Sequence, residues 1–189
     1  MKLLIQALRL FLILTLLTGV VYPAVVTMAA QLFFSYQANG SLVMKNGKLV
    51  GSELLAQKFQ GEGYFWSRSS AADFATVPSG ASNLGPTSAA LKEAVLKRAE
   101  AFRKANHLSQ GVALPSDIVF ASGSGLDPHI SPEAARLQAD RVAKARKLSE
   151  GKRQMLYKLI DQYTEAPQFG VLGDPRVNVF RLNLAVDSL

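Results

Sequence analysis

The sequence predicts an α+β protein in which a single N-terminal transmembrane helix precedes one mixed α/β domain on the extracytoplasmic side of the membrane. The 25 residues from Leu10 to Phe34 contain no ionisable side chain other than that of Tyr22. After this segment, stretches with helical periodicity alternate with short stretches of strand type. The length of 189 residues suits one domain plus an appendage rather than two full domains.

The apolar segment 10–34 is long enough to cross a bilayer. As a helix it measures about 37 Å, compared with about 30 Å for the hydrocarbon core. Lys2 and Arg9 precede it, and all 14 acidic residues follow it. The positive-inside bias therefore places residues 1–9 in the cytoplasm and the bulk of the chain across the membrane. Pro23 predicts a kink within the helix.

A cleaved signal peptide is the alternative, because the small residues at 27–30 could form a cleavage site. Signal peptides have an apolar core of only about 7–15 residues. Here the apolar character continues through Leu32, Phe33 and Phe34. The sequence therefore favours a retained anchor, a polar linker at 35–41 and a soluble α+β domain at 42–189.

Composition excludes several classes of protein. Without Cys, the chain has no disulfide, thiolate zinc site, iron–sulfur cluster or Cys nucleophile. The net charge is +7, but basic and acidic residues alternate along the predicted helices. Examples are Arg136, Asp140, Arg141, Lys144 and Glu150. This pattern is typical of solvated helix faces, so we expect no nucleic-acid binding.

The soluble domain is expected to begin with a β-hairpin at 42–50, because Asn46-Gly47 favours a type I′ turn. Residues 61–86 are rich in Ser, Gly, Ala and aromatic residues and show no helical period. Such a segment either caps the core with its aromatic side chains or contacts a partner.

Three helices and two further strands are expected after residue 86. Thr87 can cap a helix that runs to about Asn106, with one apolar side formed by Leu91, Ala94, Val95, Ala101 and Phe102. Ser131-Pro132-Glu133 begins a second helix, which runs to about Lys147. Ser149 and Glu150 begin the third, whose expected buried stripe is Met155, Leu156, Leu159, Ile160 and Tyr163. Pro167 and Gly170 end it. The strands are expected at 117–120 and, because apolar residues alternate there, at 180–186.

The segment from Ala121 to Glu133 is the candidate binding site. Gly123 and Gly125 allow the backbone to approach a ligand closely, and the N-terminus of the following helix favours an anion. A tight strand-to-helix connection explains the same residues, and the physics alone favours that interpretation. The sequence has no nucleophile elbow, Walker loop or metal-ligand spacing, so no catalytic or metal-binding residue is assigned.

Several blocks of this sequence resemble the C subunit of the Kdp-type potassium-transporting ATPase. The most specific block is Ser-Gly-Ser-Gly-Leu-Asp-Pro-His-Ile-Ser-Pro-Glu-Ala-Ala at 122–135, followed by Gln138 and by Arg141 to Arg146. Further agreement lies at Gly51-Ser52 with Gln57 and Phe59, at Gly80 to Leu84, at Val177 to Val179, and at Leu182 to Ala185. The sequence departs from the family at Arg68-Ser69-Ser70, where Arg-Pro-Ser is usual, and at Ala56, where Gly is usual.

The resemblance implies a non-catalytic, single-pass subunit of a P-type ATPase complex in the inner (plasma) membrane. Its implied partners are a channel-like potassium-binding subunit, an ATP-hydrolysing subunit and membrane lipid. The family's proposed role is that of a catalytic chaperone, needed for assembly, that raises the ATP affinity of the hydrolysing subunit. That role implies no tightly bound cofactor, but transient contact with ATP through Ser122, Gly123, Ser124, Gly125 and Gln138.

The predicted topology is in tension with direct contact, because a domain outside the membrane cannot touch cytosolic ATP. The domain could instead bias the conformation of the potassium-binding subunit from its outer face. Two other classes stay open at this point. One is an anchored exported binding domain, and the other is an anchored hydrolase using Ser124 with His129.

Overall fold

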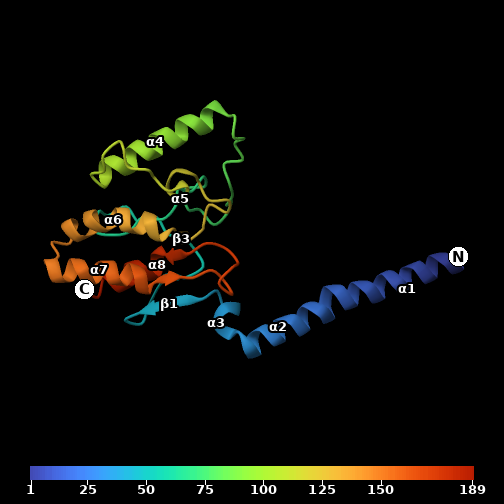
Figure 1. The fold of residues 1–189 in the computed structure, drawn as a ribbon. Coiled ribbons are helices and arrows are strands. Elements are labelled where there is room, and N and C mark those ends of the chain that lie inside the picture. The colour runs from blue at the N-terminus through green and yellow to red at the C-terminus, as the bar shows by residue number, and fades with distance from the viewer. The chain divides into compact units, whose positions relative to one another are not determined.

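The computed structural model describes all residues from 1 to 189, and they divide into two compact units, Met1–Ser52 and Glu53–Leu189. The first unit begins with one long helix, formed by α1 (Lys2–Leu16), a π-helical turn η1 (Leu17–Val21) and α2 (Tyr22–Phe33) (Figure 1). By length and composition this helix could cross a membrane, and none of its side chains is buried within the protein.

The irregularity in this helix lies just before Pro23. A proline has no N–H to donate to the preceding turn, and the ring clashes with the carbonyl four residues earlier. The π-helical turn at Leu17–Val21 occupies that position. π-Bulges are a common way for a helix to accommodate such a break.

The predicted hairpin is confirmed, with β1 at Leu42–Lys45 and β2 at Lys48–Ser52 after the short helix α3 (Ser35–Ala38). Asn46 and Gly47 have φ angles of +52° and +74°, as a type I′ turn requires. The pairing is antiparallel, with Lys45 opposite Lys48, and shifts register between Val43 and Met44.

The second unit contains five helices and a small sheet. The helices are α4 (Ala89–Ala105), α5 (Ser116–Val119), α6 (Pro132–Ala145), α7 (Glu150–Gln162) and α8 (Val179–Val186). The strands are β3 (His129–Ile130), β4 (Thr164–Glu165) and β5 (Arg176–Asn178). The sheet is antiparallel in the order β3-β5-β4, and Ile130 of β3 and Thr164 of β4 both pair with Val177 of β5. Helix α7 packs against both α6 and α8.

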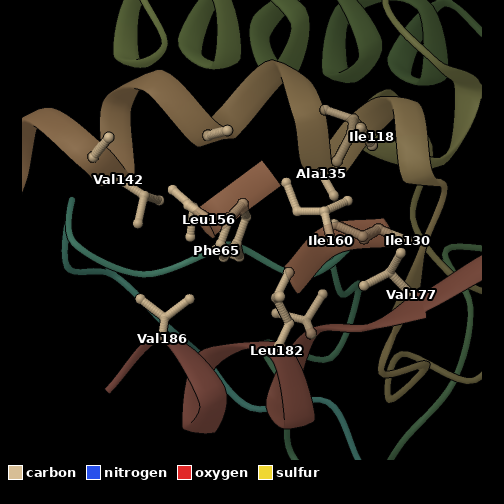
Figure 2. Close-up of a cluster of buried hydrophobic side chains, with 14 of the residues drawn as sticks. Phe65, Ile118, Ile130, Ala135, Val142, Leu156, Ile160, Val177, Leu182 and Val186 are labelled. Carbon is tan, nitrogen blue, oxygen red and sulfur yellow. The ribbon is translucent and has the colours of Figure 1, made fainter. Parts of the chain in front are cut away.

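The core of this unit lies between α6, α7, α8 and the sheet (Figure 2). Val142 and Ala135 come from α6, Leu182 and Val186 from α8, and Phe65 from the segment without regular structure. Phe65 is fully buried, so the segment 61–86 contributes an aromatic side chain to the core.

Helix α6 begins where the sequence predicts. The hydroxyl of Ser131 accepts a hydrogen bond from the N–H of Ala134 at 3.1 Å, and Pro132 occupies the first turn. The other helix limits differ modestly. Helix α4 is capped by Ser88 rather than Thr87, α7 ends at Gln162, and both Ala101 and Met155 are exposed rather than on buried stripes.

Two predicted strands are wrong. Residues 116–119 form the one-turn helix α5, in which the adjacent residues Ile118 and Val119 are both buried, whereas a half-buried strand would alternate. Residues 179–186 form α8, and only Arg176–Asn178 is extended. The side chain of Asn178 accepts a hydrogen bond from the N–H of Arg181, which caps a helix at the point where the alternation suggested a strand.

Candidate functional site

The loop Ser122–Gly125 is held at both ends by other segments of the domain, while Gly123 and Ser124 are exposed. The N–H of Ser122 donates to the carbonyl of Ser69 at 3.0 Å, and the hydroxyl of Ser124 accepts from the N–H of Leu126 at 3.1 Å. The carbonyl of Leu126 in turn accepts from the N–H of Ala56 at 2.9 Å. These bonds fix the loop as a packed connection.

Gly125 shows why this loop needs glycine at one position and not at the other. Its φ angle is +73°, and a Cβ there would lie 2.9 Å from the carbonyl oxygen of Gly80 and 3.2 Å from Oγ of Ser70. Gly123 has neither restriction, since nothing lies within 4 Å of a Cβ built on it. The requirement at Gly125 is therefore a close approach of two backbones.

Asp127 joins this loop to Arg68 and His129. Its Oδ2 accepts from Nη1 of Arg68 at 3.0 Å, while Oδ1 accepts from the N–H of His129 at 3.0 Å and lies 3.1 Å from Nδ1 of that ring. Burial by itself would raise the pKa of the Asp127 carboxyl. The hydrogen bonds from His129 and Arg68 outweigh burial and hold that pKa below its usual value of 3.8.

Beside this triad lies an open cleft of about 560 Å³. Its lining residues are Arg68, Pro115, Ser116, Asp117, Asp127, His129, Ile130, Ser131, Glu133, Asp174, Pro175 and Arg176. Four of these carry carboxylates and two carry guanidinium groups, so the lining has an excess of acid. A polyanion such as ATP is disfavoured by such a lining.

The N-terminus of α6, which was a candidate anion site, already has an anion from the chain itself. The N–H of Ser131 donates to Oδ2 of Asp117 at 2.6 Å, and the hydroxyl of Ser131 lies 3.2 Å from Oδ1. A carboxylate at a helix N-terminus is favoured by the same partial charges that would attract a phosphate. Asp117 was not identified from the sequence, because its contact with Ser131 spans 14 residues.

Gln138 is fully buried and makes four hydrogen bonds within the chain. Its Oε1 accepts from the N–H of Trp66 at 2.8 Å and from Nη2 of Arg141 at 2.9 Å. Its Nε2 donates to the carbonyls of Trp66 and Ala134, at 3.2 and 3.3 Å. Both donors and the acceptor oxygen of the amide are thus used inside the protein.

The side-chain amide of Asn183 bonds the backbone of Phe65 in the same way as Gln138 bonds that of Trp66. Oδ1 of Asn183, on α8, accepts from the N–H of Phe65 at 2.8 Å, and its Nδ2 donates to the Phe65 carbonyl at 2.9 Å. Gln138 and Asn183 therefore hold the backbone of Phe65 and Trp66 between α6 and α8. These two side chains make the backbone hydrogen bonds that a neighbouring β-strand would otherwise make. The N–H and carbonyl groups of both residues are therefore paired.

Arg141 corrects the expectation that the charged residues of α6 are all solvated. It is buried, with Nε donating to Oδ1 of Asn106 at 2.9 Å and its guanidinium lying 3.9 Å from the centroid of the Trp66 ring. Burial lowers the pKa of Arg141 to about 10, against a smaller opposing effect of Glu62. Its position three residues after Gln138, on the stripe of small apolar residues, was the sequence signal that could have identified it.

The structure does not join the pair considered for a hydrolase. Ser124 bonds the N–H of Leu126, and the Nδ1 atom of His129 faces Asp127, with no hydrogen bond between Ser124 and His129. No group of three or more His, Cys, Asp or Glu side chains is arranged to hold a metal ion. A nucleophile needs its base within hydrogen-bond reach, and this geometry does not provide one.

Comparison with known proteins gives one family over almost the full length of the chain. Residues 4–188 match the family described as "K+-transporting ATPase, c chain". The "Potassium-transporting ATPase KdpC subunit" of Methylococcus capsulatus is 51% identical over 186 residues, covering 97% of this chain and 96% of that protein. Proteins of the same description from Polaromonas naphthalenivorans and Rhodospirillum rubrum are each 52% identical, covering 97% and 96% of this chain and 93% of their own lengths.

The matches extend over both the apolar N-terminal helix and the mixed α/β unit of the structure. The chain therefore belongs to the KdpC family, the c chain of the potassium-transporting ATPase.

Proposed function

We propose that this chain is a non-catalytic accessory subunit of an ATP-driven potassium uptake complex. In this role it is needed for assembly and raises the ATP affinity of the hydrolysing subunit by acting through the potassium-binding subunit. The support is membership of the KdpC family along the whole chain and the charge bias around the apolar helix. That bias favours a cytoplasmic N-terminus, a single pass through the inner membrane and a domain at its outer face.

The observation that favours an indirect route is the bonding of Gln138. Its amide has no unused donor, and its oxygen already accepts two hydrogen bonds. To reach a nucleotide, Gln138 would have to release the backbone of Trp66 and the guanidinium of Arg141. Each release leaves a buried polar group without a partner, which costs about 1–3 kcal/mol. Direct ATP contact by Ser122, Gly123, Ser124, Gly125 and Gln138 stays a prediction that the same experiment tests.

The absence of Cys allows a clean test of topology. Ser149→Cys places one thiol at the exposed start of α7, where the serine side chain makes no capping hydrogen bond. In intact cells that co-express the other subunits, a membrane-impermeant maleimide is expected to label this position. Gln6→Cys is the control, and its labelling is expected only after permeabilisation.

Membranes with and without this chain then test the effect on ATP. We expect loss of the chain to raise the KM for ATP of the potassium-stimulated ATPase, or to abolish the assembled complex. An unchanged KM and an intact complex would refute the accessory role. Protection of position 149 together with labelling of position 6 in intact cells would reverse the topology and restore direct contact with ATP.

A further inference from the structure

The turn Gln168–Leu172, between β4 and β5, presents large apolar side chains to solvent. Phe169 is 91% exposed, Val171 79% and Leu172 58%. Scattered exposed apolar residues are ordinary, but three within four positions of one turn form a contiguous apolar tip. Contiguous exposed apolar patches are typical of sites that contact another protein or a membrane.

The backbone of this turn is ordered by its own hydrogen bonds. Gln168 and Leu172 exchange both of theirs, each N–H lying 2.9 Å from the carbonyl oxygen of the other residue. The N–H of Val171 also donates to the carbonyl of Gln168 at 3.2 Å. The exposed apolar side chains therefore extend from a turn whose backbone is fixed by hydrogen bonds.

Phe169 occupies a position that the turn itself does not favour. Phe169 and Gly170 have φ angles of +54° and +76°, the positive pair of a type I′ turn. The chain's other hairpin fills the same pair of angles with Asn46 and Gly47, the residues that adopt them most easily. A bulky aromatic residue at positive φ is strained, and such strain is concentrated at functional positions.

The charges next to the tip favour a protein partner over lipid. Residues 166–174 include no Lys or Arg, and Asp174 adds an exposed carboxylate directly after the turn. The next cation along the chain, Arg176, is paired with Glu165 at 3.0 Å. Segments that insert into a membrane interface usually carry basic residues, which anionic lipids attract. An apolar tip beside a carboxylate complements an apolar pocket with a basic rim.

We propose that the 168–172 turn is the docking element by which this domain binds the potassium-binding subunit, with Phe169 inserted into an apolar pocket and Asp174 facing a basic residue at its rim. This inference rests on the proposed function. It assigns the contact to one turn and to Asp174, which also lines the acidic cleft, and the Ser122–Gly125 loop has no part in it.

Phe169→Asn separates docking from folding. Asn adopts positive φ readily, so the variant is expected to keep or increase the stability of the domain. We expect the amount of potassium-binding subunit that co-purifies with the full chain from detergent-solubilised membranes to fall on the order of tenfold or more, as for a buried aromatic anchor. The control is Leu96→Gln, which removes an exposed apolar side chain from α4 and is expected to leave co-purification unchanged.

Unchanged co-purification of Phe169→Asn, beside a wild-type chain that does co-purify, would overturn the docking site and leave the accessory role intact. A wild-type chain that fails to co-purify would overturn both. A photoreactive benzophenone amino acid at position 169 identifies the occupant. Crosslinking to the potassium-binding subunit supports the proposal, whereas crosslinking only to lipid, to the hydrolysing subunit or to this chain itself overturns it.

Discussion

Residues 122–125 and residues 168–172 are both glycine-containing turns with positive φ angles, but their surroundings differ. In the first turn, Ser122 and Gly125 are buried, and neighbouring segments lie close enough to exclude a Cβ at Gly125. In the second, a Cβ built on Gly170 meets nothing within 4 Å, and the apolar side chains face solvent. A Ser-Gly-rich segment can therefore serve packing, while a turn whose apolar side chains face solvent is the better candidate for recognition.

The largest expected effect lies at Gln138, in the buried polar network around Trp66 and Arg141. Gln138→Leu leaves the N–H and carbonyl of Trp66 unpaired and removes a partner of Arg141. We expect the free energy of unfolding of the full chain in detergent to fall by roughly 3 kcal/mol or more, since several buried groups lose partners at once. Chemical denaturation followed by circular dichroism measures this change.

Gln162→Leu, at the exposed end of α7, is the control and should stay within about 0.5 kcal/mol of wild type. A stable Gln138→Leu protein whose complex shows a raised KM for ATP would contradict the structural role and favour direct nucleotide contact.

A smaller effect is expected at Gly125, one of the two glycines in the turn 122–125. Gly125→Ala combines a positive φ with a Cβ 2.9 Å from a backbone oxygen, so we expect a loss of about 1–3 kcal/mol in unfolding free energy. Gly123→Ala, two residues away in open space, should be nearly neutral. Thermal unfolding of both variants would sharpen the comparison, and equal losses would show that close packing is not what sets the glycine requirement.

The smallest expected effect is on how the free energy of unfolding depends on pH. It involves Asp127, which lies beside the first turn, and Asp174, which lies beside the second. Because the folded state holds the pKa of Asp127 below its usual value, this group stabilises the fold above that value and loses its contribution as the pH falls through the lowered pKa. We expect Asp127→Asn to be less stable than wild type at neutral pH. We also expect it to lose less stability than wild type between about pH 5 and pH 2, the range in which Asp carboxylates usually become protonated.

Asp174→Asn, beside the exposed turn, is the matched variant, and its free energy of unfolding at neutral pH should stay within about 0.5 kcal/mol of wild type. Urea denaturation at several pH values measures the free energy of unfolding of wild type and the two variants. Parallel profiles for Asp127→Asn and wild type would mean that the Arg68 and His129 contacts contribute nothing to acid sensitivity.

Local signals in the sequence were enough for some of these elements. The apolar run of α1 and α2, the Asn46-Gly47 hairpin and the Ser131-Pro132 start of α6 each depend on residues adjacent in the chain. The resemblance to the Kdp C subunit, carried by short blocks of residues, likewise identified the family that full-length comparison confirms. Short-range periodicity failed at α8, where eight residues were too few to distinguish an alternating strand from a capped helix.

What only the tertiary structure decided is which polar residues are used internally. Gln138 contacts Trp66 across 72 positions and Asn183 contacts Phe65 across 118, so no spacing rule predicts either pair. The same holds for the burial of Arg141 and for the carboxylate of Asp117 at the start of α6. Sequence determines local conformation through hydrogen bonds between near neighbours. Whether a polar side chain has a hydrogen-bond partner inside the protein depends on which distant residues the fold places next to it.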